Sequence, residues 1–230
     1  MKYLEIRDFE SINDKLVFNA DDCRIVGKCE LYTTKAAGSD KKLCKSIERS
    51  LEQRYVEDLA KSPNSPSSAL SKSPFGPLNL SASRKTFAYI IATMNASHPD
   101  HDFSSLRPFD FRNERNLSAV LNALNTTLSM QGQLQTAGLW ELIDRHIDLS
   151  QCDIYSYAPD ADSDPHGGDG LLWSQSYFFF SKEQKRVLYF TVRGCSLRSP
   201  PLKARDYESD ASDDLDGSKS VVFDMDDFAL

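Results

Sequence analysis

The 230-residue sequence predicts an α+β fold, and two observations support that prediction. Residues 173–180 and 186–193 are aromatic, β-prone runs separated by a short polar loop, which is the pattern of a β-hairpin. Other segments repeat apolar residues at helical spacing, which predicts helices with one buried face. The length suits one domain with accessory segments, or at most two small domains.

The first sixty residues combine strand and helix patterns. Residues 2–6 are a possible short strand. Asp8 is a plausible N-cap for a helix that follows it, because the next apolar residues recur at helical spacing. Residues 23–34 alternate between apolar and polar side chains and predict a strand. A polar turn then leads to a helix expected over residues 41–60.

The second half of the chain continues this alternation of elements. We expect core helices over residues 84–97, from Asn116 to a break at Gly132, and over residues 139–147. Residues 152–157 alternate like a short strand, and the aromatic hairpin follows. Because this hairpin is the densest aromatic region of the chain, we expect it at the centre of the core.

Residues 61–83 are rich in serine and proline and separate the two halves. Such a segment buries too little apolar area to offset its ordering entropy, so we predict that it is disordered. Ser62, Ser65 and Ser73 each precede a proline, as substrates of proline-directed kinases do. A phosphate on each would add a charge of about −1.5 to −2. From these residues alone, a phosphorylated insert and a passive linker are equally good interpretations.

The net charge of −7 is concentrated at the C-terminal end. Residues 206–230 hold nine acidic residues and one lysine, a net −8, so residues 1–205 carry a net +1. We therefore expect a near-neutral globular part, formed by residues 1–60 and 84–196, followed by a disordered acidic tail over residues 197–230. This balance argues against a strongly basic nucleic-acid binder, and we expect no sequence-specific contact with nucleic acid.

Motifs for catalysis or metal binding are weak in this sequence. The five cysteines form no CxxC pair, so we expect reduced thiols and no structural zinc. The run from Asp160 to Asp164 suggests a calcium loop, but Pro165 and Leu171 stand where an EF-hand needs glycine and glutamate. The longest apolar runs are too short to span a membrane. Two alternatives stay open: a metal-dependent enzyme that uses the Asp160–Asp164 loop, and a binder of histones or other basic proteins that uses the acidic tail.

Three groups of motifs resemble the sequence boxes of the Maf-one family, which are repressors of RNA polymerase III. Residues 1–5 (MKYLE) and 35–42 (KAAGSDKK) are similar to the first box. Residues 83–104 contain SRKT, IATMN and PDHDFS, which resemble the second. Residues 152–174 contain CDIYSY, PDADSDP and GLLWS, which resemble the third. His166 departs from the family pattern, where an aromatic residue such as phenylalanine is expected.

The resemblance implies a single domain with a mostly antiparallel β-sheet flanked by α-helices, no cofactor and no catalytic activity. It implies binding to the clamp and winged-helix subunits of RNA polymerase III and to the Brf subunit of the initiation factor. It also implies kinases and phosphatases that act on the insert under nutrient signalling, and shuttling between nucleus and cytoplasm with the phosphorylation state. For Ser62, Ser65 and Ser73 it favours regulation over a passive linker.

A charged surface for the polymerase follows from these boxes as a hypothesis. Its residues would be Lys35, Asp40, Asp160, Asp162 and Asp164. Complementary charges of this kind set orientation and partner choice more than affinity. The alternative for the three loop aspartates is that they only cap turns.

Overall fold

The structure of the chain is a computed structural model, and it describes residues 1–35, 38–61, 73–132, 138–158 and 170–198. The fold below is that of the unit formed by Met1–Ser199. In the described part of the chain, no helix is long and apolar enough to cross a membrane.

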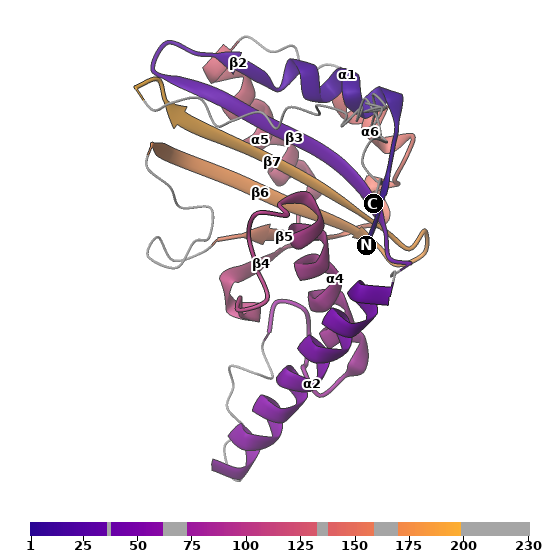
Figure 1. The fold of residues 1–230 in the computed structure, drawn as a ribbon. Coiled ribbons are helices and arrows are strands. Elements are labelled where there is room, and N and C mark those ends of the chain that lie inside the picture. The colour runs from indigo at the N-terminus through magenta and orange to yellow at the C-terminus, as the bar shows by residue number, and fades with distance from the viewer. Residues whose placement is uncertain (36–37, 62–72, 133–137, 159–169, 199–230) are drawn as a thin grey trace, which may run out of the picture. The chain divides into compact units, whose positions relative to one another are not determined.

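A seven-stranded sheet in which every pairing is antiparallel forms the centre of this unit, as the sequence predicts (Figure 1). The strand order is β1-β3-β7-β6-β5-β4, and β2 pairs with β3 beside this path. The strands are β1 (Lys2–Leu4), β2 (Val17–Asn19), β3 (Cys23–Thr33), β4 (Phe111–Glu114), β5 (Asp153–Tyr157), β6 (Leu171–Ser181) and β7 (Arg186–Ser196). The predicted hairpin, β6 and β7, lies in the interior of the order.

Helices cover both faces of the sheet (Figure 1). On one face α4 (Ser81–Ser97) packs on the strands, and α2 (Gly38–Lys61) packs against α4. The other face carries α1 (Arg7–Lys15), α5 (Leu117–Gly132) and α6 (Leu139–Asp144). Two short 3-10 turns, Pro108–Asp110 and Leu149–Gln151, precede β4 and β5.

Side chains of alternate residues in the central strands pack into two separate cores, one on each face of the sheet. Phe178 and Tyr189 point to the α4 side, where their rings stack with centroids 4.7 Å apart. Phe179, Leu188 and Phe190 belong to the core on the side of α1, α5 and α6. All five side chains are fully buried. The aromatic runs are continuous in the sequence because both faces of these strands are covered.

The outer edge of β3 is shared by two short strands. β1 pairs with the Leu31 end and β2 with the Ile25 end, and α1 connects them. Gly27 lies between these pairings, and its N–H donates to the carbonyl of Leu16 at 2.8 Å. A Cβ atom on Gly27 would stand 2.8 Å from the Leu16 Cβ, so this approach requires glycine.

The predicted disorder of residues 61–83 is wrong for residues 73–83. Phe75 and Leu78 are buried in the core, and the Phe75 ring stacks on Tyr155 with centroids 4.5 Å apart. The buried guanidinium of Arg84 donates to the carbonyls of Leu78 and Asn79, at 2.8 and 3.0 Å. The buried side chains of Phe75 and Leu78, with the hydrogen bonds from Arg84, thus hold in place a segment whose composition is typical of a linker.

Several predicted boundaries shift in the structure. Helix α1 begins at Arg7, so Asp8 lies inside its first turn and is not the N-cap. Its carboxylate instead contacts the His146 Nε2 atom at 2.8 Å. Helix α2 begins at Gly38, three residues earlier than expected. The Asn116 cap is confirmed, because its Oδ1 accepts from the Ala119 N–H at 3.1 Å.

Candidate partner-binding surface

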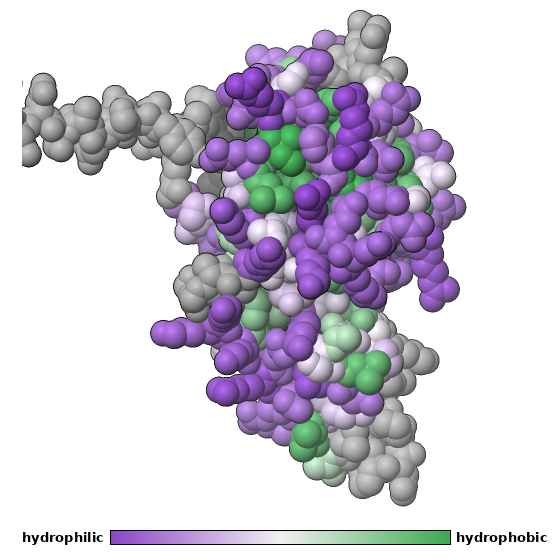
Figure 2. All heavy atoms as spheres, turned by 90° about the vertical axis from the view of Figure 1, so that its right-hand side faces the viewer, coloured by the Kyte–Doolittle hydropathy of each residue, from purple (hydrophilic) through white to green (hydrophobic). Residues whose placement is uncertain are grey.

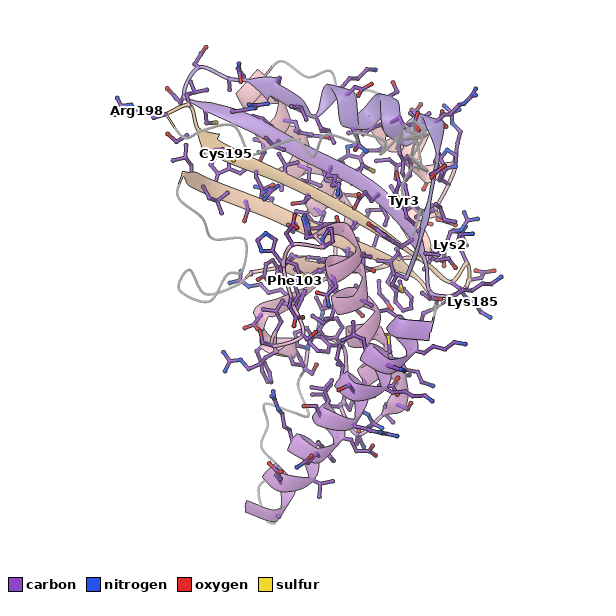
Figure 3. All side chains as sticks on the ribbon, viewed as in Figure 1. Lys2, Tyr3, Phe103, Lys185, Cys195 and Arg198 are labelled. Atoms are coloured by element: carbon purple, nitrogen blue, oxygen red, sulfur yellow. The ribbon has the colours of Figure 1, made fainter. Side chains whose placement is uncertain are left out.

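Three lysines from separate segments lie near the C-terminal end of β3. Lys2 belongs to β1 and pairs with Thr33, two residues before Lys35. Lys185 belongs to the β6–β7 turn, where its carbonyl accepts from the Thr34 N–H at 2.9 Å. Figure 3 shows Lys2 and Lys185 at one end of the sheet and Cys195 and Arg198 toward the other. We call Lys2, Lys35 and Lys185 the lysine end.

The lysine end is exposed and free of compensating carboxylates. All three side chains are exposed, and none forms an ion pair within the described residues. By contrast, Lys182 in the same hairpin turn is 2.7 Å from a carboxylate oxygen of Asp153. Figure 2 shows this side of the molecule, where polar side chains surround small apolar areas. Unpaired cations on a fixed scaffold favour an acidic partner.

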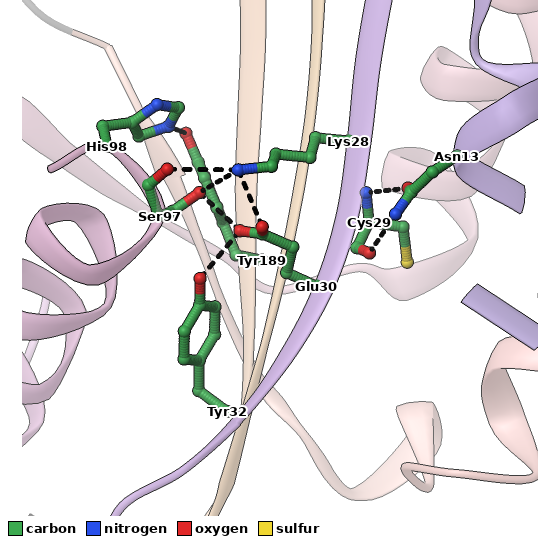
Figure 4. A network of polar contacts seen from close by, with 8 residues as sticks. All are labelled: Asn13, Lys28, Cys29, Glu30, Tyr32, Ser97, His98 and Tyr189. Carbon is green, nitrogen blue, oxygen red and sulfur yellow. Dashed lines mark hydrogen bonds and ion pairs between the residues drawn. The ribbon is translucent and has the colours of Figure 1, made fainter. Parts of the chain in front are cut away.

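A buried carboxylate on β3 holds this end of the sheet against α4 (Figure 4). Glu30 is only 7% exposed, and the Lys28 ammonium contacts its Oε1 atom at 2.7 Å. The Tyr32 hydroxyl donates to Oε2 at 2.8 Å, and the Ser97 hydroxyl at the end of α4 donates to the same oxygen. Lys28 also donates to the Ser97 carbonyl at 3.1 Å. A buried charge needs such partners, so the network fixes β3 relative to α4.

The polar network extends toward β7 through His98. Its Nε2 atom lies 3.1 Å from the Tyr189 hydroxyl, and the side chain is half-buried. Burial raises the pKa of the Tyr189 hydroxyl. Burial, with the charge of Glu30 next in size, likewise raises the pKa of Tyr32. Both phenols therefore stay protonated at neutral pH, and the Tyr32 hydroxyl donates to Glu30.

The other residues of the predicted charged surface are only partly placed. Asp40 lies in the first turn of α2. Asp160, Asp162 and Asp164 lie outside the described residues. The chain leaves the described part after Ala158 and returns at Gly170.

The register places Gly170 far from Lys35. The Gly170 carbonyl accepts from Ser196, which pairs with Cys23 at the start of β3, whereas Lys35 follows the end of β3. The eleven residues of β3 span roughly 33 Å. The role of the predicted charged surface in binding therefore stays a prediction.

The predicted phosphorylation sites differ in what the structure says of them. Ser62 and Ser65 lie outside the described residues. Ser73 is 6% exposed, and its hydroxyl oxygen accepts from the Phe75 N–H at 3.2 Å. A kinase needs an accessible, extended serine, so Ser73 is not a substrate in this conformation.

In the part of the chain that the structure describes, no group of three His, Cys, Asp or Glu side chains could hold a metal ion. The described cysteines are free thiols. Burial, with Asp148 as the second cause, raises the pKa of the Cys152 thiol to about 12. A protonated thiol is a poor nucleophile, so Cys152 is a structural cysteine.

Comparison with known proteins decides the family. A family model described as Maf1 regulator matches residues 25–191, which contain most of the sheet and helices α2, α4, α5 and α6. The chain belongs to the Maf1 family. This confirms the resemblance carried by the three groups of sequence motifs.

Relatives of the Maf1 family match more than four fifths of the chain. The chain is 56% identical over 197 residues to "Repressor of RNA polymerase III transcription maf1" of Schizosaccharomyces pombe, across 84% of this chain and 83% of the relative. It is 31% identical over 237 residues to "Repressor of RNA polymerase III transcription" of Dictyostelium discoideum, across 84% of each. A crystal structure of citrus MAF1 superposes with a TM-score of 0.59 at 30% identity, across 82% of this chain and 98% of that one.

Family membership was predictable from the sequence motifs, but the lysine end was not. Sequence reasoning selected Lys35 and left out Lys2 and Lys185. They meet only because β1 and the β6–β7 turn both flank the last residues of β3. The signal in the sequence, a basic residue in each of three separate segments, becomes meaningful once the strand pairing is known.

Proposed function

We propose that this chain represses transcription by RNA polymerase III through protein–protein binding. The observation that supports the proposal best is the 56% identity, over 84% of the chain, to a relative named as a repressor of that polymerase. The relatives are named as regulators, which supports binding rather than catalysis as the mode of action. The metal-enzyme and histone-binding alternatives gain no support from any described residue.

The lysine end is one part of the polymerase-binding surface that we propose. Lys2 lies in the paired strand β1, the Lys185 carbonyl accepts from the Thr34 N–H, and Lys35 directly follows Thr34. A partner with acidic side chains at matching spacing would be steered into one orientation. We include the polymerase clamp and winged-helix subunits and the Brf subunit in this proposal as the partners that the family resemblance implies.

Phosphorylation is the proposed control. Phosphates on Ser62 and Ser65 would add negative charge after the C-terminal end of α2, where they repel an acidic partner. Localisation in nucleus and cytoplasm, with nuclear entry of the dephosphorylated chain, belongs to the same proposal. Ser73 is left out of the switch because its side chain is buried.

The test is affinity purification of the tagged full-length chain from its own cells, with identification of the co-purifying proteins. Subunits of RNA polymerase III should co-purify with the wild-type chain. Lys35→Glu should reduce their yield about tenfold, because it places like charges in contact. Lys45→Glu, an exposed site on α2 that changes the net charge equally, is the matched control and should bind normally.

Two results would count against the proposal. Absence of polymerase subunits from the wild-type purification would contradict the function itself. Equal losses with Lys35→Glu and Lys45→Glu would leave the function intact but remove the lysine end from the interface.

A further inference from the structure

The half of the sheet remote from the lysine end has one face that no described helix covers. In Figure 1, α4 lies over the middle of the sheet and does not reach the start of β3. The burial of side chains along β3 also differs between the two faces of the sheet. Cys23 and Ile25 are buried in the core on one face, whereas Arg24 and Val26, on the other face, are half-buried.

The strand register assembles this surface from three neighbouring strands. Val26 of β3 pairs with Arg193 of β7, and Arg193 pairs with Ser174 of β6. Neighbouring strands are about 4.8 Å apart, and residues two apart on a strand about 6.7 Å, so the set forms a compact patch. We define the open face by Arg24, Val26, Ser174 and Arg193, and by Leu172, the exposed residue at the β-bulge that precedes Trp173 in β6.

The charge of the open face is positive and largely uncompensated. Lys28, the next residue of β3 on this side toward the lysine end, is paired with Glu30 and contacts Ser97 of α4, so it lies outside the open face. Neither Arg24 nor Arg193 forms an ion pair within the described residues. The Arg193 Nε atom is buried and has no hydrogen-bond acceptor among the described residues. A buried donor without an acceptor is unfavourable, and a carboxylate that accepts from the guanidinium removes that cost.

Apolar area accompanies these cations. Leu172 is 55% exposed, and Val26 is half-buried beside Arg193. A free phosphate or a single carboxylate would use the arginines but leave these side chains in water. An extended peptide presents side chains at a period of two, so acidic and apolar side chains can meet arginine and apolar residues in the same rows.

We propose that the open face docks an extended acidic peptide of a partner protein. Its carboxylates pair with Arg24 and Arg193, and its apolar side chains pack on Val26 and Leu172. This surface is separate from the lysine end, since it lies at the opposite end of β3. The inference stands apart from the proposed function, because it concerns peptide binding whether or not the polymerase is the partner.

The test uses the purified full-length chain and a fluorescent synthetic peptide that alternates aspartate with valine. Fluorescence anisotropy should show binding that weakens as salt rises, and the same peptide with asparagine in place of aspartate should not bind. Arg24→Glu should weaken binding at least about tenfold. Arg49→Glu, on the exposed face of α2, carries the same charge change and should alter the affinity less than about twofold.

The alkylation rate of the Cys195 thiol provides a second measurement of binding at the open face. It is a half-buried free thiol that pairs with Arg24 in the register. Bound peptide should slow its alkylation in the Arg49→Glu variant as in the wild type, and should have no such effect in Arg24→Glu. This rate reports the place of binding independently of affinity.

Three outcomes would overturn the proposal. The first is that the peptide fails to bind. Occupation of the open face by the chain's own acidic residues would give this same result and would also contradict the proposal. Arg24→Glu and Arg49→Glu weaken binding equally. A short oligothymidylate displaces the peptide and depends on Arg24 in the same way, which would make the face a general polyanion site.

Discussion

Asn13 completes the outer edge of β3 through a pair of hydrogen bonds to Cys29. Its side-chain Oδ1 accepts from the Cys29 N–H at 2.6 Å, and its Nδ2 donates to the Cys29 carbonyl at 3.1 Å (Figure 4). Cys29 lies between the stretches of β3 that pair with β1 and β2. One amide side chain on α1 thus replaces a strand residue where the two short strands leave a gap.

Replacing Asn13 with alanine should therefore destabilise the fold by about 2–4 kcal/mol, because two backbone groups lose their partner and each unsatisfied group costs about 1–3 kcal/mol. Urea unfolding followed by circular dichroism measures this loss. Asn19→Ala, at an exposed asparagine of β2, is the control and should cost less than about 0.5 kcal/mol. Equal effects of the two substitutions would show that the Asn13 side chain does not complete the edge.

Gly27→Ala should destabilise the chain by about 1–3 kcal/mol, because the new methyl group would overlap the Leu16 side chain at 2.8 Å. Thermal unfolding of the purified variant measures the change. Val26→Ala is the matched control on the adjacent residue, whose side chain is on the opposite face and only half-buried. A neutral Gly27→Ala would mean that α1 moves away from β3 at little cost.

Ser73→Asp should destabilise the folded chain by about 1–3 kcal/mol, because it places a charge where the side chain is 6% exposed. Ser105→Asp, at an exposed serine, should be neutral. Denaturant unfolding compares the two, and phosphorylation by a proline-directed kinase tests accessibility. Rapid phosphorylation of Ser73 in the natively folded chain would contradict the burial of this segment.

The raised pKa of Cys152 predicts a loss of stability in alkali. Burial keeps the folded thiol protonated to about pH 12, whereas the thiol in the unfolded chain ionises near 9.0. Between these values the unfolded state loses a proton that the folded state retains, so stability falls as pH rises, by at most about 1.4 kcal/mol per pH unit for this group. Cys152→Ser should lose less stability across that interval in urea unfolding. Identical pH profiles for the two proteins would contradict the shift.

The sequence predicted the main elements because each carries enough periodic residues. Strands β3, β6 and β7 each span eleven residues, so their patterns are long enough to identify. The three-residue β2 and four-residue β4 were missed, because so few positions set no period and both strands depend on their neighbours.

The site was less predictable than the fold because it depends on strand register. Composition suggested disorder up to residue 83, although Phe75 and Leu78 were a visible signal of folding. Lys35 was predicted as part of a binding surface and is exposed, but Lys2 and Lys185, which lie at the same end of the sheet, come from distant segments. The predicted aspartates Asp160, Asp162 and Asp164 lie outside the described residues, so this part of the predicted surface stays a prediction.

The central claim is repression of RNA polymerase III, and a reconstituted transcription reaction tests it most directly. Purified full-length chain is added to the polymerase, its initiation factors and a transfer-RNA gene. Transcript should fall with increasing wild-type chain, Lys35→Glu should require about ten times more protein, and a reaction driven by RNA polymerase II should be unaffected. Unchanged transfer-RNA transcription at saturating wild-type chain would contradict the account.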